Sequence, residues 1–282
     1  MAKLCFGWNY ASNHQSDEDG HIILIWKAPA VVNVLHQSRQ SLTCEVILPL
    51  CPPFCYTMIY ASNISAERSD LWVELLDLHR SLGLEKKPWI LGGDFNQIVD
   101  HREHSLAHID TTTSPMSDFR DCLDQLGVFD LIYQGPTFSW SNHQPTMPIA
   151  KKLDRLLIND MALQSFPDAA ANFLPPLTFD HCPCILSLAI TLPSAGSKPF
   201  KFLNYLSKHP NFLRVVFETW VQAGSASHTL TSLCWKLKCL KNALRTLNRD
   251  NFSKIQERVN DTNNLLQCLQ VQALQKPFTT PL

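Results

Sequence analysis

The chain has 282 residues, of which 45% are hydrophobic and 10% aromatic, and its formal net charge is −1. This composition excludes an intrinsically disordered chain, because enough apolar surface is present to form a core. No apolar run approaches the roughly 18–20 residues that cross a bilayer, so no membrane partner is expected. No signal peptide is recognised, and the ten cysteines include no C-x-x-C pair, so we expect an intracellular, reduced protein.

The small net charge hides two regions of opposite character. Residues 1–197 carry 12 Lys and Arg against 21 Asp and Glu, whereas residues 198–282 carry 12 against 4. A Pro-Ser-Ala-Gly-Ser run between them is typical of a linker. We therefore predict a domain over 1–192, a linker over 193–199 and a basic helical segment over 200–282.

Strands dominate the first 60 residues, and a helix follows them. Four runs rich in β-branched and aromatic residues are separated by polar or proline-bearing breaks. These runs cover 22–26, 31–35, 42–48 and 54–60. The spacing of apolar residues then changes to that of an amphipathic helix over about 65–83.

The stretch Lys87–Asn96 predicts a buried strand that ends in polar groups. Three bulky apolar residues lead into two glycines, which let the backbone approach another group closely. Because side chains alternate along an extended chain, Asp94 and Asn96 point one way while Phe95 points into the core. The pattern indicates either a ligand site at a strand end or a simple Asx turn.

A polar, histidine-rich loop comes next, and the rest of the domain alternates again. For this loop a solvated segment is favoured over a metal site; its residues are His101, Glu103, His104 and His108. A helix is predicted over 115–127, with Gly127 as its stop. Further strands are predicted over 137–141, 152–158 and 184–190. Strands and helices in this order indicate a layered α/β domain.

The basic C-terminal segment shows the spacing of a long helix or a helical hairpin. Leucines recur at alternating steps of three and four residues between Leu230 and Leu247, as in a heptad seam. This seam is expected to be the face that packs. It would pack on a partner protein, on nucleic-acid phosphates or on the segment itself, and the spacing does not choose between them.

Four further stretches carry polar groups that make chemical sense beside Asp94 and Asn96. They are Ile59–Asn63, Thr137–Asn142, Lys152–Ile158 and Phe179–Pro183. In this order they resemble the endonuclease/exonuclease/phosphatase superfamily over residues 20–192. Within this superfamily, three motifs are most similar to the endonuclease domain of plant LINE-type non-LTR retrotransposons. They are Trp-Ile-Leu-Gly-Gly-Asp-Phe-Asn, Phe-Ser-Trp-Ser-Asn and Leu-Asp-Arg.

The resemblance implies a four-layered α/β sandwich of two packed mixed sheets flanked by helices. It also implies a Mg²⁺-dependent hydrolase that nicks DNA in the nucleus. Asp94 would activate the attacking water, and His181, hydrogen-bonded to Asp154, would contact the scissile phosphate. Asp180 would bind Mg²⁺. The remaining site residues would hold phosphate oxygens or line the cleft; they are Tyr60, Asn63, Asn96 and Asn142. Trp140 faces either the core, which is favoured, or the DNA.

The sequence departs from the family pattern in two places. The segment Phe6-Gly7-Trp8 resembles the one that follows the family's metal-binding Glu, so the chain is expected to be truncated before it, without the first strand and helix. Phe179 replaces the usual Ser before Asp-His. Mg²⁺ binding is therefore expected to be weak or dependent on substrate.

Three functions remain open at this stage. The chain is a LINE-type endonuclease impaired by the missing Glu, or an inactive retroelement remnant that keeps the fold and weak nucleic-acid binding. A phosphatase of the same fold is less favoured. The basic helices would bind DNA, a reverse transcriptase or its RNA.

Overall fold

The computed structural model describes residues 7–106, 111–144, 146–190, 202–224 and 229–275. Its contacts divide the chain into one unit of Met1–Leu192 with Gln267–Leu282 and another of Pro193–Leu266. The predicted linker lies almost wholly outside the described residues, and the predicted domain limits remain expectations. Each unit is considered by itself below.

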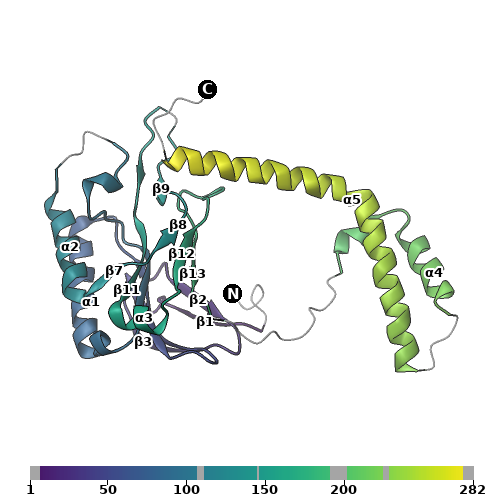
Figure 1. Ribbon diagram of the computed structural model, residues 1–282, viewed down its shortest axis with the longest axis horizontal. Helices are drawn as coiled ribbons and strands as arrows, with labels where there is room; N and C mark the ends of the chain where they lie inside the picture. Colours follow the sequence, from purple (N-terminus) through teal and green to yellow (C-terminus); the bar gives the residue numbers. More distant parts are fainter. Residues whose placement is uncertain (1–6, 107–110, 145, 191–201, 225–228, 276–282) are drawn as a thin grey trace. The chain divides into compact units, whose positions relative to one another are not determined.

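A six-stranded mixed sheet forms the centre of the first unit (Figure 1). All neighbouring strands run antiparallel except β5 and β6, which are parallel. In spatial order the strands are β3 (Val31–Gln37), β4 (Ser41–Ile47), β5 (Phe54–Tyr60), β6 (Trp89–Asp94), β11 (Asp154–Asn159) and β7 (Val128–Asp130).

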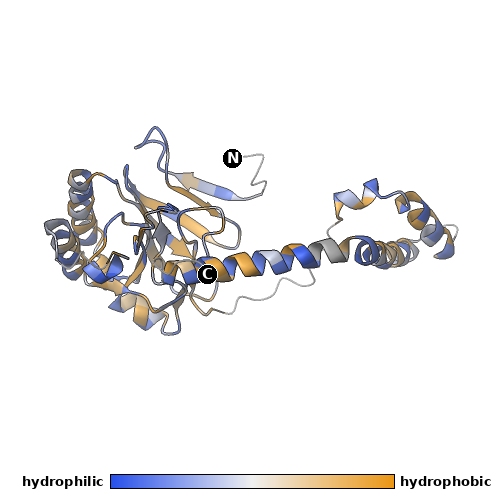
Figure 2. Cartoon of the chain, turned by 90° about the horizontal axis from the view of Figure 1, so that it is seen from above, coloured by the Kyte–Doolittle hydropathy of each residue, from blue (hydrophilic) through white to orange (hydrophobic). Residues whose placement is uncertain are grey.

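The central strands are buried on both faces, which explains their continuous apolar sequences. Leu91 and Leu157 point into one hydrophobic cluster, while Ile90 and Leu156 point into another on the opposite face. This arrangement follows from the two-residue period of a strand. In Figure 2 the strands are accordingly mainly orange, whereas the helices alternate between orange and blue.

Two helices cover one face of this sheet, α1 (Ser65–Ser81) and α2 (Ser114–Leu126). The ring of Trp72 in α1 stacks on Phe119 in α2 at 4.5 Å between centroids. Helix α2 ends at Gly127, whose φ of 64° is the left-handed conformation that glycine adopts at little cost. Both helices were predicted to within two residues at each end.

The other face is covered by a second, three-stranded sheet of β8 (Tyr133–Gln134), β12 (Ala170–Phe173) and β13 (Cys184–Ser187). The short helix α3 (Asp160–Ser165) packs into the same cluster. Two further pairs complete the unit: β1 (Asn9–Ser12) with β2 (Ile23–Trp26), and β9 (Trp140–Ser141) with β10 (Ala150–Lys151).

The predicted α/β fold of packed sheets and helices is confirmed, with local corrections. Of the strand expected over 137–141, only Trp140–Ser141 forms a strand. The strand expected at 152–158 is β11, which begins at Asp154. Strands β1, β7, β8, β10 and β12 were not predicted, and all five have only two to four residues.

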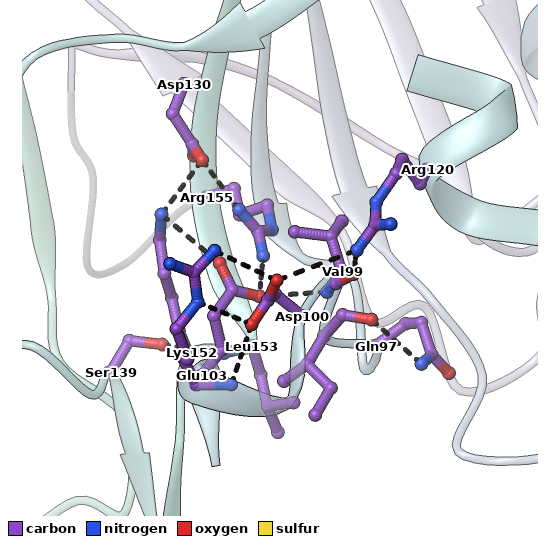
Figure 3. A network of polar contacts seen from close by, with 12 residues as sticks. Gln97, Val99, Asp100, Glu103, Arg120, Asp130, Ser139, Lys152, Leu153 and Arg155 are labelled. Carbon is purple, nitrogen blue, oxygen red and sulfur yellow. Dashed lines mark hydrogen bonds and ion pairs between the residues drawn. The ribbon is translucent and has the colours of Figure 1, made fainter. Parts of the chain in front are cut away.

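One residue of the loop around His101, which was predicted to be solvated, belongs instead to a largely buried ion network (Figure 3). His108 of that loop lies outside the described residues. Glu103, at the end of the short helix η2 (His101–Glu103), pairs with Arg155, whose side chain is fully buried. Asp130 binds the same guanidinium at 2.7 Å and the ammonium of Lys152 at 2.9 Å. The network joins the loop to strands β7 and β11.

The second unit is helical within its described part, as predicted. It contains η3 (Asn204–Lys208), α4 (Phe212–Gln222) and most of α5 (Leu230–Gln275). The leucine seam packs only in its second half: Leu244 and Leu247 are buried, whereas Leu230 is 77% exposed. Of the helices that the structure describes, none is long and apolar enough to cross a membrane.

Candidate active site

The ends of three neighbouring strands bring the predicted polar residues together. Tyr60 ends β5, Asp94 ends β6 and Asp154 begins β11. In the sheet Tyr60 lies opposite Asp94, and Asp94 lies opposite Asp154. Residues that are paired in register share one face. Strand pairing alone therefore places two carboxylates side by side, although they are 60 positions apart in the sequence.

Gly93 allows this close approach of strands. Its φ is +142°, and a Cβ at this position would lie 2.0 Å from the carbonyl oxygen of Ile59 on β5. The turn beyond it is held by Asp94, whose Oδ1 accepts the N–H of Asn96 at 2.8 Å. The Asn96 amide donates to the carbonyl of Ala61 at 2.8 Å and to Asp94 Oδ2 at 3.1 Å. Asp94 therefore forms an Asx turn and at the same time belongs to the polar site.

His181 reaches the same place from the loop before β13. Its Nδ1 lies 2.8 Å from Asp154 Oδ2, the hydrogen bond that was predicted, and its Nε2 lies 3.8 Å from Asp94 Oδ2. Backbone contacts fix His181 and the residue that follows it. Trp140 and His181 form a β-bridge, and the N–H of Cys182 donates to the carbonyl of Ser139 at 2.7 Å.

The charges of this group act on one another. Burial, followed by the charge of Asp154, raises the pKa of Asp94 to about 6. Burial alone would lower the pKa of His181, but its hydrogen bond to Asp154 and the nearby carboxylates outweigh burial and raise that pKa. The pKa of Asp94 therefore lies near the range suited to proton transfer at neutral pH, and the protonated form of His181 is favoured.

Asp94, Asp154 and His181 form the one group among the described residues whose ligand atoms all lie within 4.8 Å of one another. Asp180, the predicted metal ligand, is outside this group. Its side chain accepts a hydrogen bond from Trp140 Nε1 at 3.2 Å, and its charge still acts on Asp94 and His181. Three carboxylates facing one imidazole fit a divalent cation, because oxygen ligands and excess negative charge are what Mg²⁺ and Ca²⁺ require.

Tyr60 and Asn63 lie beside the cluster rather than in it. With Asn96 they line a pocket of about 240 Å³. The ring of Tyr60 stacks on His21 with 4.9 Å between centroids. The side chain of Asn142 binds its own loop: Oδ1 accepts the N–H of Ile149 at 2.9 Å, and Nδ2 donates to the carbonyl of Met147. Its place in the cleft stays a prediction.

Two further residues support the site and were not predicted. The buried hydroxyl of Ser139 accepts the backbone N–H groups of Leu153 and Asp154, at 3.0 and 2.8 Å. The guanidinium of Arg68 is buried, donates to Ser62 and Gln97, and lies close enough to Asp94 for their charges to interact. Nothing in a lone Ser or Arg distinguishes such roles in the sequence. The ring of Trp140 packs on a hydrophobic cluster, the alternative that was favoured, and its N–H donates to Asp180.

Several solved structures are similar to this chain. The endonuclease domain of TRAS1, a telomere-specific non-LTR retrotransposon, has a TM-score of 0.53 and 11% identity, covering 66% of this chain and 82% of that domain. A mannosyl-6-phosphatase of Bacteroides thetaiotaomicron has a TM-score of 0.43 and 13% identity, covering 66% and 79%. Beta toxin from Staphylococcus aureus has a TM-score of 0.43 and 12% identity, covering 58% and 67%.

The sequence comparisons add one family. No curated protein matches the sequence significantly. The pattern of the Endonuclease/Exonuclease/phosphatase family, however, matches residues 7–170, which is more than half of the chain. The chain therefore belongs to the endonuclease/exonuclease/phosphatase family.

Proposed function

We propose that the chain is a metal-dependent phosphodiester hydrolase that nicks DNA. The observation that carries this proposal is the convergence of Asp94, Asp154 and His181, with Nδ1 of the histidine 2.8 Å from one carboxylate and Nε2 3.8 Å from the other. Hydrolysis of a phosphodiester needs a base for water and a cationic contact for the phosphate. The cluster supplies both groups.

The residues of the cluster take complementary roles in this proposal. Asp94, with a pKa near 6, is ionised at neutral pH yet basic enough to accept a proton from water. Asp154 orients the His181 ring and favours its protonated form, which places a positive charge beside the phosphate. Tyr60 and Asn63 line the adjoining pocket and are available to bind further phosphate oxygens.

A divalent cation completes the proposed site, and members of this family typically depend on one. Asp180 would hold Mg²⁺, with Asp94 as the nearest further carboxylate. When bound, the cation would neutralise charge that develops on the phosphate and the leaving oxygen. The remaining steps, in which a proton moves to Asp94 and a phosphate is bound by His181, belong to side chains of the chain itself.

The sequence motifs support the proposal that the chain is the endonuclease part of a LINE-type retrotransposon of plants. The named relative of the same fold, the TRAS1 domain, is the endonuclease of a non-LTR retrotransposon. The basic segment after residue 198 would then act as a connector that binds RNA or a reverse transcriptase. The substrate in this setting is DNA, and the location is nuclear.

The alternative, a protein that keeps the fold but hydrolyses little, is favoured by a specific observation. Of the described glutamates upstream of Asp94, Glu45 pairs with Asn33 and Glu67 with Ser62 and Arg39, so neither belongs to the cluster. Each anionic ligand that a Mg²⁺ site lacks lowers its affinity for the cation. Weak Mg²⁺ binding is therefore expected.

Nicking of supercoiled plasmid over a Mg²⁺ titration tests the proposal, with calorimetry on the same sample to measure Mg²⁺ binding. Asp94→Ala and His181→Ala should each abolish nicking, while Asp118→Asn on the exposed face of α2 should leave it unchanged. Nicking by the unaltered chain that survives Asp94→Ala would reject the assignment. Absence of nicking at saturating Mg²⁺ would favour the alternative.

A further inference from the structure

We propose that Gln270, near the end of α5, is a positioning residue that fixes the loop carrying Asp180 and His181. The proposal rests on the proposed function, because those two residues are assigned there to metal and phosphate. It makes the last turns of α5 part of the site's support, although the sequence predicts a separate basic helical segment over 200–282. Residues from Gln267 onward belong to the same unit as the site.

The side-chain amide of Gln270 binds both backbone groups of a single loop residue. Its Oε1 accepts the N–H of Leu177 at 3.0 Å, and its Nε2 donates to the carbonyl of Leu177. The two residues are 93 positions apart. A glutamine amide is neutral and can donate and accept in one plane.

Leu177 needs such support because of its backbone conformation. Its φ is +55°, in the left-handed region that non-glycine residues rarely adopt. The residue is also 37% exposed, so packing alone holds it only in part. Two hydrogen bonds from one side chain compensate a conformation that the loop would otherwise leave.

Several hydrogen bonds hold the loop, and Gln270 adds two of them at Leu177. At the base of the loop the N–H of Leu174 donates to the carbonyl of Pro183 at 2.8 Å, and the N–H of Cys182 donates to the carbonyl of Ser139 at 2.7 Å. Next to the site the carbonyl of Asp180 accepts the N–H of Ser141 at 3.0 Å, and His181 forms its β-bridge with Trp140. Gln270 holds Leu177, which precedes Asp180 in the loop, so loss of its side chain releases the segment that leads into both site residues.

The helix end that carries Gln270 is itself anchored. Leu274 lies one turn further along, on the same helix face. It is 5% exposed and belongs to the hydrophobic cluster that also contains Phe138, Phe173 and Cys182, the neighbour of His181. Gln272, in contrast, is exposed and contacts only Cys268 of its own helix. It therefore provides a matched control.

The full chain and three variants test the inference by hydrogen–deuterium exchange of residues 174–181 and by NMR of the His181 ring. Gln270→Ala should speed exchange at the Leu177 amide roughly tenfold and shift the His181 ring resonances. Gln270→Glu, which keeps the acceptor but loses the donor, should have a smaller effect. Gln272→Ala should change neither signal. Exchange and ring resonances that are unchanged in Gln270→Ala would overturn the proposal.

DNA nicking provides a second test of the role of Gln270. If the unaltered chain nicks DNA, Gln270→Ala should lower kcat while KM for DNA stays nearly constant, since binding of the duplex does not depend on the loop tip. An equal loss of folding stability in Gln270→Ala and Gln272→Ala, with no specific loss of kcat, would also overturn the proposal. If the unaltered chain does not nick, the proposed function fails, and the exchange and ring measurements still decide the role of Gln270.

Discussion

Asp94 and Asp154 are directly paired across β6 and β11, and both carboxylates contact the ring of His181. The pairing places two negative groups side by side at the ends of two central strands. His181, the nearby guanidinium of Arg68 and whatever binds the site must balance them. This charge arrangement determines the first prediction.

Asp94→Asn should stabilise the metal-free protein at alkaline pH. The pKa of Asp94 is about 6 in the folded state against 3.8 for the unfolded reference. The folded state therefore binds the proton more tightly than the unfolded state. The ionised carboxylate begins to lower the free energy of unfolding as the pH rises above 3.8, and the full effect is reached above pH 6. The difference between the two pKa values corresponds to a gain of about 3 kcal/mol for the variant, and loss of the hydrogen bond from the Asn96 amide reduces this gain by about 1 kcal/mol.

Thermal unfolding in EDTA between pH 4 and 8 measures this effect. The variant should melt at a higher temperature than the unaltered chain at pH 8, and the difference should shrink as the pH falls through 6 toward 4. A variant that is less stable than the unaltered chain at pH 8 would show that Asp94 is not penalised by burial. Asp118→Asn, on the exposed face of α2, should show no such pH dependence.

Glu103→Gln should destabilise the domain strongly, because it removes a charge from the buried network. The fully buried guanidinium of Arg155 and the ammonium of Lys152 would then share Asp130 alone. Loss of one partner from a buried pair typically costs about 3–5 kcal/mol. Urea unfolding measures the change. The exposed Glu85→Gln serves as control and should stay within about 0.5 kcal/mol; a similarly small change for Glu103→Gln would contradict the prediction.

The sequence predicted those parts of the site that depend on residues close together in the chain. Asp94 follows a buried strand and two glycines, so its place at a strand end could be predicted. The partnership of Asp154 with His181 was implied by the resemblance. Glu103 was misjudged because its partner Arg155 lies 52 positions away, and no local period reports a contact of that separation. Gln270 escaped notice for the same reason, since its partner Leu177 belongs to a loop 93 positions earlier.

The contacts of Asn142 show a second limit of local pattern. Its motif implies a cleft residue, but asparagine also favours turns, and the sequence did not predict that its side chain binds the loop that follows it. The short strands β8 and β12 form because neighbours in the folded sheet offer hydrogen bonds. Their own residues do not specify an extended conformation.

Lys236→Met should stabilise the helical unit. Lys236 is 2% exposed, and its Nζ has no hydrogen-bond partner among the described residues, although it lies 4.6 Å from the ring centroid of Trp220. Burial of a charge with only an aromatic face as partner is costly, and a methionine fills similar volume. The gain should be about 1 kcal/mol in urea unfolding of the full chain. The exposed Lys238→Met should give no gain, and a destabilised Lys236→Met would show that the cation–π contact outweighs burial.

Binding of nucleic acid by the basic region should depend steeply on salt and be reduced by neutral substitutions on α5. Lys238 and Arg245 are exposed on this helix, in a region that carries 12 basic against 4 acidic residues. Each phosphate contact that releases a counterion contributes about 0.9 to the slope of log K against log salt for duplex DNA. Lys238→Gln with Arg245→Gln should therefore lower the slope by up to about 2. Fluorescence anisotropy from 50 to 300 mM KCl measures it, with Lys86→Gln on the acidic domain as control. A slope that is unchanged in the double variant, or that falls as much in the control, would place binding elsewhere than on these helices.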